Sequence, residues 1–491
     1  MVKLLVGLVL AGLLALPASA GTGTTGDPYT VGSGLDYETI TLAIAAASAG
    51  EFIEVQDPSI TEDVLGQNKA NITIRGEAGS KVIWIPATSI AYTGNHANAD
   101  GWTFSNFSFV GLGTNVHSGF SLNSTNDSIT ITDCDFTNMR AAIYGAGVGS
   151  VLTISNINIS SPQDTSLSTI PGIYLYNKTN TTMTNVKFDG RGSSGTDWVR
   201  AMYGRACTGL TIENLSVLLD SGEDGTGIMF DDDNSDISIR NSYFEGGSGS
   251  HIQFGIPQVG EACDQTLIEF VTSVDCKTFP IYYAQIVTEA VTDAHNDATI
   301  QNNWIYGNGT TATGINLVGV VGGSVTSNEV SDMASSGIGL KGCQNIATHG
   351  NRLYRNDSAY TLAGSDTTDM GLLALNNSFT GNFVDGDGDD GAVKIDNYDA
   401  VNSLAARQDS LWVIGGNVYY NVAQVGAWVS VGNSQTNFAT MSGWAAQLAS
   451  MNAIFLDEYG SLDDPAGGRG LYKKAGLLPG KNTRGNVGPH W

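Results

Sequence analysis

A short two-strand unit recurs through most of the chain and constrains its fold more than any other feature of the sequence. One complete copy is Thr226–Glu245, in which a first apolar segment runs into the polar turn Asp231–Asn234 and then into a second apolar segment, Ile237–Ile239. Related second segments read apolar-x-apolar, mostly followed by Asn or Asp, and lie at residues 129–136, 152–159, 183–188, 210–217, 237–244, 298–305 and 325–330. The apolar anchors of successive first segments are roughly 23 to 34 residues apart, which is typical of one solenoid coil with loops of varying length.

The length and composition favour such an array over a single compact core. The chain has 491 residues, and only 14% of them are charged, which argues against disorder. The short segments have a period of two, and no helical periodicity lies between them. These features predict an all-β fold, a parallel β-solenoid in which each coil pairs in register with the next, about 4.8 Å away.

The first twenty residues have the pattern of a targeting segment. A basic residue, Lys3, precedes the apolar run Leu4–Leu16 and the small-residue site Ala18–Ala20. This order is typical of a secretory signal peptide, and no later stretch is apolar enough to span a bilayer. The sequence therefore predicts a secreted protein, extracellular or periplasmic.

The remaining chain divides into three predicted segments. Residues 21–70 form an N-terminal cap, with a helix over Asp36–Ser48 that begins at Asp36 as N-cap and covers the first rung of the array. Residues 71–432 form the coils. Residues 433–491 form an irregular closing segment that includes a short helix over Asn437–Met451.

The pattern resembles that of the right-handed parallel β-helix (pectin-lyase-like) superfamily, which includes pectate lyases, polygalacturonases, other polysaccharide lyases and phage tailspikes. The segment Val31–Ile40 and the following Ala43–Ala47 look like the N-terminal cap of many members, and the likeness extends from Pro28 to Val431. It implies the fold and a carbohydrate-active protein, but it matches no specific family. Asp232-Asp233 and His251 echo polygalacturonases only in part, because the other motifs of that family are missing.

The net charge of the chain limits the kinds of partner that it can bind. The net charge of −26 disfavours nucleic acid and anionic membranes as partners. It also disfavours a polyanionic substrate, unless calcium or a local Arg or Lys reverses the sign of the local electrostatic potential.

Of the five cysteines, Cys263 and Cys276 are close enough in sequence to close one loop by a disulfide, and the other three are predicted to be buried.

Aligning the first strands on their inward residues gives two columns of outward side chains. The first reads Ser121, Tyr144, Tyr174, Tyr203, Met229, Gln253, Tyr282, Asn316, and the second reads Asn123, Ala146, Tyr176, Arg205, Asp231, Gly255, Ala284, Val318, Lys341. Neighbouring tyrosines beside Arg and Asp are what a glycan-binding groove needs, since sugar rings have apolar faces and polar rims. Alternatively, the tyrosines only stabilise the sheet, and a slip of one residue would turn the column inward.

The acidic turn allows three interpretations. Asp231, Asp232 and Asp233 have the carboxylate density for Ca²⁺, with Glu223 and Asp224 shortly before them. In a lyase, Ca²⁺ or Arg205 would neutralise a uronate while a base removes a proton, the candidates being Arg205, Tyr203, Tyr176 and an outward-facing His251. In a hydrolase, Asp231 and Asp233 would act as acid and base. The third interpretation is a solvated turn.

Two functions from different classes remain open. The first is a secreted carbohydrate-active enzyme, a lyase or glycoside hydrolase, that cleaves a polysaccharide in a groove lined by Tyr144, Tyr174, Tyr176, Tyr203, Gln253 and Tyr282. The second is a non-catalytic glycan-binding or structural surface protein of the adhesin type. The preference for an enzyme depends on analogy with the superfamily.

Overall fold

The computed structural model describes residues 21–94, 100–112, 118–122, 128–149, 151–160, 172–191, 199–220, 225–255, 262–284, 294–363, 376–386, 391–396 and short segments between 413 and 455. The predicted signal peptide lies outside these residues, as do Asn123, Glu223, Asp224 and residues 456–491. Within the described part, no helix is long and apolar enough to cross a membrane.

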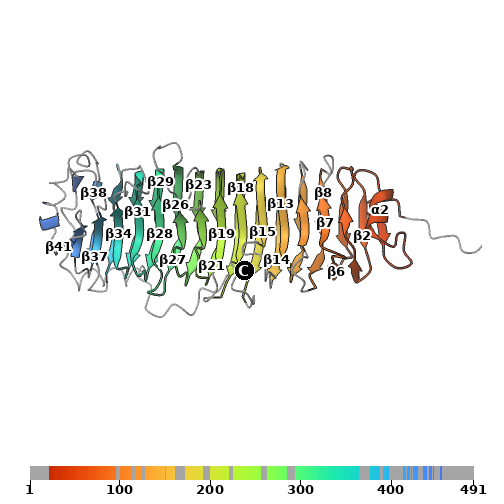
Figure 1. Cartoon of the computed structure of the whole chain (residues 1–491), viewed down its shortest axis with the longest axis horizontal. Coiled ribbons are helices and arrows are strands. Elements are labelled where there is room, and N and C mark those ends of the chain that lie inside the picture. The colour runs from red at the N-terminus through yellow and green to blue at the C-terminus, as the bar shows by residue number, and fades with distance from the viewer. Residues whose placement is uncertain are drawn as a thin grey trace, which may run out of the picture. The chain divides into compact units, whose positions relative to one another are not determined.

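The chain forms two compact units, each a stack of parallel strands (Figure 1). Unit 1 comprises residues 1–256 and 261–277, and unit 2 comprises residues 257–260 and 278–491. In each unit one sheet receives a single strand per coil, and we call it the single-strand sheet. The other receives two strands per coil, or one long bent strand, and we call it the paired-strand sheet.

The single-strand sheet of unit 1 carries the predicted tyrosine column. Its strands are β4 (Val64–Leu65), β7 (Ile90–Gly94), β10 (Ser118–Leu122), β13 (Ala141–Gly149), β15 (Ile173–Lys178), β17 (Arg200–Arg205), β19 (Thr226–Asp231) and β22 (Ile252–Phe254). The inward anchors pair coil to coil and are fully buried, in the order Phe120, Ile143, Ile173, Met202, Ile228, Ile252. The predicted parallel solenoid and its register are therefore confirmed for these strands.

The paired-strand sheet of unit 1 bends once in each coil. Its strands are β1 (Tyr29–Val31), β2 (Phe52–Val55), β3 (Ser59–Thr61), β5 (Thr73–Gly76), β6 (Val82–Ile85), β8 (Trp102–Ser105), β9 (Phe107–Val110), β11 (Ile129–Thr132), β12 (Asp135–Thr137), β14 (Leu152–Ser160), β16 (Thr182–Asp189), β18 (Thr208–Leu218), β20 (Asn234–Arg240), β21 (Tyr243–Glu245), β23 (Cys263–Glu269) and β24 (Thr272–Val274). The bends at Asn156, Asn185 and Asn214 have φ of 53°, 54° and 56°. Asn tolerates this left-handed conformation better than most residues, which explains why the repeat places Asn there.

Unit 2 follows the same plan. Its single-strand sheet contains β25 (Ile281–Tyr283), β28 (Thr313–Val318), β31 (Ser336–Lys341), β34 (Ser358–Ala363), β37 (Gly391–Asp396), β40 (Gln424–Val429) and the antiparallel β41 (Gln435–Phe438). Its paired-strand sheet contains β26 (His295–Gln301), β27 (Trp304–Tyr306), β29 (Val320–Thr326), β30 (Glu329–Ser331), β32 (Gln344–His349), β33 (Arg352–Tyr354), β35 (Ser378–Thr380), β36 (Phe383–Asp385), β38 (Val413–Gly415), β39 (Val418–Tyr420) and β42 (Ile454–Phe455). Buried amides link its bends, since each Nδ2 donates to the next Oδ1 at 2.9–3.0 Å, in the order Asn303, Asn328, Asn351, Asn382, Asn417.

The capping helix α2 is present but shorter than predicted. It spans Ile40–Ala46, and its N-cap is Thr39 rather than Asp36. Asp36 instead accepts hydrogen bonds from the backbone N–H groups of Gly21 and Thr30, both at 3.0 Å, so its carboxylate stabilises the neighbouring loop. The helix packs its buried face against β1, β2 and β4 and covers the first strands, as predicted.

Two further predictions concern the C-terminal helix and the disulfide. Residues 442–444 and 446 are helical, within the predicted helix Asn437–Met451, although residues 437 and 438 belong to β41. The predicted disulfide is wrong, because Cys263 and Cys276 are both buried thiols that form no disulfide. The Cys276 thiol donates to the Gly249 carbonyl oxygen at 3.2 Å, and the Cys263 sulfur instead lies 3.8 Å from an Asn234 amide nitrogen.

Candidate functional site

The predicted tyrosine column forms on adjacent strands of unit 1. Tyr144 on β13 pairs with Tyr174 on β15, which pairs with Tyr203 on β17. On either side the column continues with Ser121 and Met229, the two residues that the sequence alignment placed there. Tyr144 is 39% exposed, whereas Tyr174 and Tyr203 are half-buried. The column therefore faces outward, and no slip of one residue has turned it into the core.

The rings contact one another along the column. Tyr144 and Tyr174 stack with centroids 4.8 Å apart and planes 11° apart, and Tyr203 is tilted by 58° against Tyr174 at 5.5 Å. This stacking stabilises the sheet, as the alternative interpretation held. It also leaves Tyr144 as the ring with the most open surface, because its other neighbour in register, Ser121, has a short side chain.

The second column brings Tyr176, Arg205 and Asp231 together as predicted. Tyr176 pairs with Arg205, which pairs with Asp231 on β19. The Arg205 guanidinium lies over the Tyr176 ring, 5.6 Å from its centroid, in a cation–π contact. Met229 is buried and interrupts the aromatic column on the strand where the carboxylates begin.

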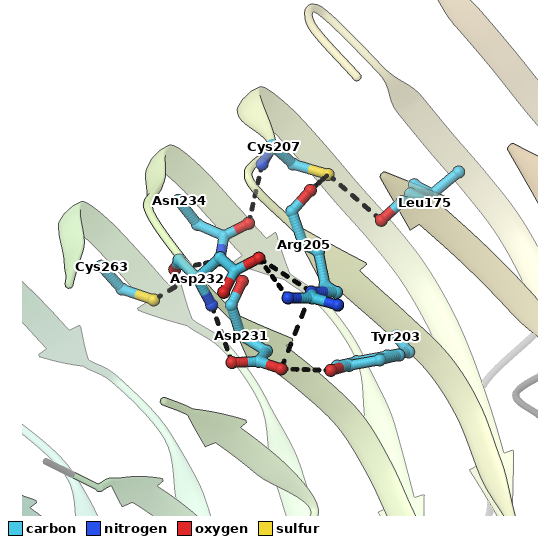
Figure 2. A network of polar contacts seen from close by, with 8 residues as sticks. All are labelled: Leu175, Tyr203, Arg205, Cys207, Asp231, Asp232, Asn234 and Cys263. Atoms are coloured by element: carbon cyan, nitrogen blue, oxygen red, sulfur yellow. Dashed lines mark hydrogen bonds and ion pairs between the residues drawn. The ribbon is translucent and has the colours of Figure 1, made fainter. Parts of the chain in front are cut away.

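Arg205 is engaged by two carboxylates (Figure 2). Its Nε donates to Oδ2 of Asp232 at 2.8 Å, and a second guanidinium nitrogen lies 2.6 Å from the same oxygen. Its Nε is also 3.8 Å from Oδ2 of Asp231. The positive charge that the sequence assigned to a substrate carboxylate is thus largely neutralised within the protein.

Asp231 is buried, and protein groups hydrogen-bond to its carboxylate. The Tyr203 hydroxyl donates to Oδ2, and the backbone N–H of Asp232 donates to Oδ1 at 2.8 Å. Asp231 is only 4% exposed. Burial and the hydrogen bond to Asp231 raise the pKa of Tyr203, so the phenol keeps its proton. Asp231 therefore orients Tyr203 and Arg205.

The pKa of Arg205 also remains high. Partial burial acts to lower it, but the hydrogen bond and the charge of Asp232 outweigh burial and raise the pKa above its ordinary value. For Tyr174, burial raises the pKa as well. None of these three groups has the lowered pKa that a proton-abstracting base needs near neutral pH.

Asn234 holds the acidic turn in place (Figure 2). Its Nδ2 donates to the carbonyl oxygens of Asp231 at 2.7 Å and Asp232 at 2.9 Å. Its Oδ1 accepts from the backbone N–H of Cys207 at 2.9 Å, which ties the turn to the preceding coil. Asp232 itself adopts a positive φ of 58°, and the amide compensates for this bend.

The three aspartates are held in different ways, and the calcium site stays a prediction. Asp232 is bound to Arg205, Asp231 accepts from Tyr203, and Asp233 is exposed without a hydrogen bond to any described residue. Across the described residues no group of three or more His, Cys, Asp and Glu side chains is arranged to hold a metal ion. The same arrangement gives Asp231 and Asp233 different surroundings, one buried and one open.

His251 does not face outward, and this prediction is wrong. The side chain is 1% exposed and stacks on Phe244 at 5.7 Å. Its Nε2–H donates to the Gly246 carbonyl oxygen at 2.6 Å, and Nδ1 accepts from the Ser273 hydroxyl at 2.7 Å. Burial lowers the pKa of His251 to about 4, so the ring is neutral at neutral pH. It is a core residue of unit 1.

The strict alternation of a strand fails at His251 because the chain is still bending there. The residue before each inward anchor also faces inward, and in earlier coils it is small: Gly119, Ala142, Gly172, Ala201, Gly227. A Cβ added at Gly227 would lie 2.8 Å from the Phe244 ring, the same ring that His251 stacks on. This row of small residues is the sequence signal that indicates an inward position.

The two other predicted binding residues lie further along the first column. Gln253 follows Met229 in register, is half-buried, and donates from Nε2 to the Gly255 carbonyl oxygen at 3.0 Å. Tyr282 belongs to unit 2, where it pairs with Asn316 and contacts the Phe279 ring at 4.6 Å. Within unit 1 the column thus consists of three tyrosines.

Sequence reasoning missed two buried cations beside the column. The Arg200 guanidinium lies 5.1 Å from the centroid of the Tyr203 ring, on the same strand. Lys178 follows the bend at Asn177 and turns inward, where its Cε would contact a Cβ at Gly145 at 3.2 Å. Burial lowers the pKa of both groups. Their only sequence signal is a basic residue at the end of a strand, Arg200 at the start of β17 and Lys178 at the end of β15.

Comparison with solved structures finds similar chains at low identity. A PL6 family polysaccharide lyase from Pseudopedobacter saltans is 16% identical, with 77% of this chain and 90% of that chain covered and a TM-score of 0.42. The A-module of the mannuronan C-5 epimerase AlgE4 from Azotobacter vinelandii is 13% identical, with 79% and 91% covered and a TM-score of 0.40. The Dettilon tailspike protein is 12% identical, with 72% of this chain and 64% of the tailspike covered and a TM-score of 0.42. These values transfer no activity to the chain.

No curated protein matches the chain. A family model described as right handed beta helix region matches residues 79–258. The matched residues lie in unit 1, and parallel strands stack in register on both sides of them within that unit. The described strands therefore form a parallel β-solenoid, and residues 79–258 are similar to the right handed beta helix region.

Proposed function

We propose that the protein binds a polysaccharide along the tyrosine column of unit 1. The observation that carries this proposal is the outward column of Tyr144, Tyr174 and Tyr203 on successive strands, with Tyr144 39% exposed. The column offers an open aromatic surface at Tyr144 and phenol groups along its length, a combination that suits the apolar faces and hydroxyl rims of sugars.

The charges beside the column favour an uncharged glycan. Arg205 is neutralised by Asp232 and lies close to Asp231, while Asp233 is exposed. A carboxylated sugar would have to compete with Asp232 for the guanidinium and would be repelled by the exposed carboxylate. A neutral sugar meets neither cost.

Binding without cleavage is favoured by the state of the candidate catalytic groups. Tyr203 and Arg205 have raised pKa values, and His251 is enclosed in the core. Asp231 is buried, and each of its carboxylate oxygens accepts a hydrogen bond from a protein group, which does not suit a general acid that must reach a glycosidic oxygen. The predicted cleavage of a polysaccharide stays a prediction.

The proposal is tested by measuring the affinity of the full chain for soluble neutral polysaccharides, namely galactan, glucomannan and dextran. Tyr144→Ala is expected to weaken binding about tenfold, since it removes the open ring. The matched control is Tyr243→Ala, which removes a half-buried outward tyrosine of the paired-strand sheet of the same unit. The proposal fails if none of the three polysaccharides binds, or if both variants weaken binding equally. New reducing ends or unsaturated products would establish cleavage instead.

A further inference from the structure

A second outward column with aromatic and charged side chains lies in unit 2, on the paired-strand sheet. Trp304 on β27 pairs with Glu329 on β30, Glu329 pairs with Arg352 on β33, and Arg352 pairs with Phe383 on β36. Trp304 is 40% exposed, and the other three residues are half-buried. At the usual strand spacing, Trp304 and Arg352 lie about 10 Å apart along the column.

Glu329 is held between Trp304 and Arg352 by a phenol. The Tyr306 hydroxyl donates to Oε1 of Glu329 at 3.1 Å. Burial raises the pKa of Glu329, although the hydrogen bond from Tyr306 and the charge of Arg352 oppose this. Glu329 is half-buried, and it makes no ion pair within 4.0 Å with any residue that the structure describes.

Arg352 differs from the other arginine nearby. The Arg355 guanidinium donates to both carboxylate oxygens of Asp332, each at 2.7 Å, so that pair is neutral. The Arg352 guanidinium makes no hydrogen bond and no ion pair with the part of the chain that the structure describes, and its side chain is partly exposed. Its planar fork of N–H donors remains open to a carboxylate from outside.

We propose that Trp304, Glu329 and Arg352 form a binding site for an acidic glycan. The Arg352 guanidinium pairs with a sugar carboxylate, and the exposed Trp304 ring packs against the apolar face of a neighbouring sugar. Glu329 accepts a hydrogen bond from a sugar hydroxyl between them. The open guanidinium supplies the local positive charge that a chain of net charge −26 needs to hold a polyanion.

This site is independent of the tyrosine column. It lies on the other type of sheet and in the other unit, and its arginine is open where Arg205 is neutralised. The sequence offered a signal, because Trp304, Glu329 and Arg352 each precede a buried apolar residue in the same part of the coil, namely Ile305, Val330 and Leu353. The alignment of the first strands does not include these three residues, so the sequence did not predict the site.

The experiment compares polygalacturonate with its fully methyl-esterified form, using the full chain at low ionic strength. Arg352→Gln is expected to weaken binding of polygalacturonate by about tenfold to a hundredfold and to leave binding of the esterified form unchanged, because only the free carboxylate uses the guanidinium. Trp304→Ala is expected to weaken binding of both forms. Added salt is expected to reduce polygalacturonate binding by the wild type more than by Arg352→Gln.

The matched control is Arg240→Gln, which removes an exposed guanidinium on the paired-strand sheet of unit 1, where it lies 3.6 Å from Glu269. It is expected to bind polygalacturonate as the wild type does. Equal affinity of the wild type for the two polymers, failure to bind polygalacturonate, or equal losses in Arg352→Gln and Arg240→Gln would each overturn the proposal. Tyr144→Ala is expected to keep polygalacturonate binding, so the outcome is separate from that for the tyrosine column.

Discussion

Unit 1 and unit 2 each place an arginine beside exposed aromatic rings, and the two arginines are in opposite states. Arg205 is bound by Asp232 and lies close to Asp231, whereas Arg352 has no carboxylate within ion-pair distance among the described residues. The same residue types therefore give one site suited to neutral sugars and one suited to acidic sugars. Each arginine has a carboxylate one coil away in register, Asp231 for Arg205 and Glu329 for Arg352. The difference therefore comes from side-chain geometry, because Arg205 lies 3.8 Å from Asp231 and 2.6 Å from Asp232, and Arg352 forms no ion pair within 4.0 Å with a described residue.

The two units also differ at the bend of the paired-strand sheet. In unit 1 the residue after the left-handed bend is usually apolar and packs in the core, as Ile157, Val186 and Leu215 do. In unit 2 the same position is a buried asparagine that hydrogen-bonds to its counterpart in the next coil, as Asn328 does to Asn351. Unit 1 is held there by apolar packing, and unit 2 by amides whose loss leaves buried groups unpaired.

The largest expected effect is a loss of stability at the amide-linked bends of unit 2. Asn351→Leu removes an acceptor for the N–H and Nδ2 of Asn328 and a donor to the carbonyl oxygen of Val325. Leaving these buried groups unpaired is expected to lower the free energy of unfolding by about 3–5 kcal/mol. Thermal unfolding combined with hydrogen exchange of unit 2 peptides measures this. A loss below about 1 kcal/mol would show that the ladder adds little to stability.

The next effect is a pH dependence of unit 1 that originates at His251. Its folded pKa of about 4 lies below the ordinary 6.5, so the unfolded state binds the proton more readily. Stability is then lost as pH falls from 6.5 toward 4, by roughly 3 kcal/mol in total. His251→Gln is expected to flatten this dependence of the unfolding midpoint. An unchanged slope in the variant would assign the pH dependence to other groups.

A smaller effect concerns how much each of the two arginines contributes to the stability of the protein. Arg205→Gln leaves the buried Asp231 without its nearby cation and is expected to destabilise unit 1 by about 1–2 kcal/mol. Arg352→Gln breaks no ion pair with a described residue and is expected to change stability by less than about 0.5 kcal/mol. Urea unfolding of both variants tests the contrast. Equal destabilisation would mean that Arg352 is also engaged within the protein.

The smallest effect concerns the exposed asparagines of unit 1. Asn185 donates to Asn156 at 2.9 Å and accepts from Asn214 at 3.1 Å, on the surface of the bend. Asn185→Gly removes these bonds and keeps the positive φ, so we expect a loss of less than about 1 kcal/mol, because water replaces the amide. A loss as large as that of Asn351→Leu would contradict the distinction between exposed and buried ladders.

Most of the candidate site in unit 1 could be predicted because it depends on register alone. Tyr144, Tyr174 and Tyr203 were aligned from their inward neighbours, and a period of two then fixes the face on which each lies. His251 was misplaced because a residue at a bend does not follow that period. The disulfide between Cys263 and Cys276 was misjudged because closeness in sequence says nothing about which neighbours two buried thiols meet.

The sequence by itself determined the coil, its length and the outward column, since these follow from the spacing of apolar residues and of asparagines that accept a left-handed bend. Only the tertiary structure decided which charges meet. Arg205 and Asp232 are 27 residues apart, and Tyr203 and Asp231 are 28 apart. Whether such groups neutralise one another depends on side-chain geometry across the coil, and this geometry is what separates Arg205 from Arg352.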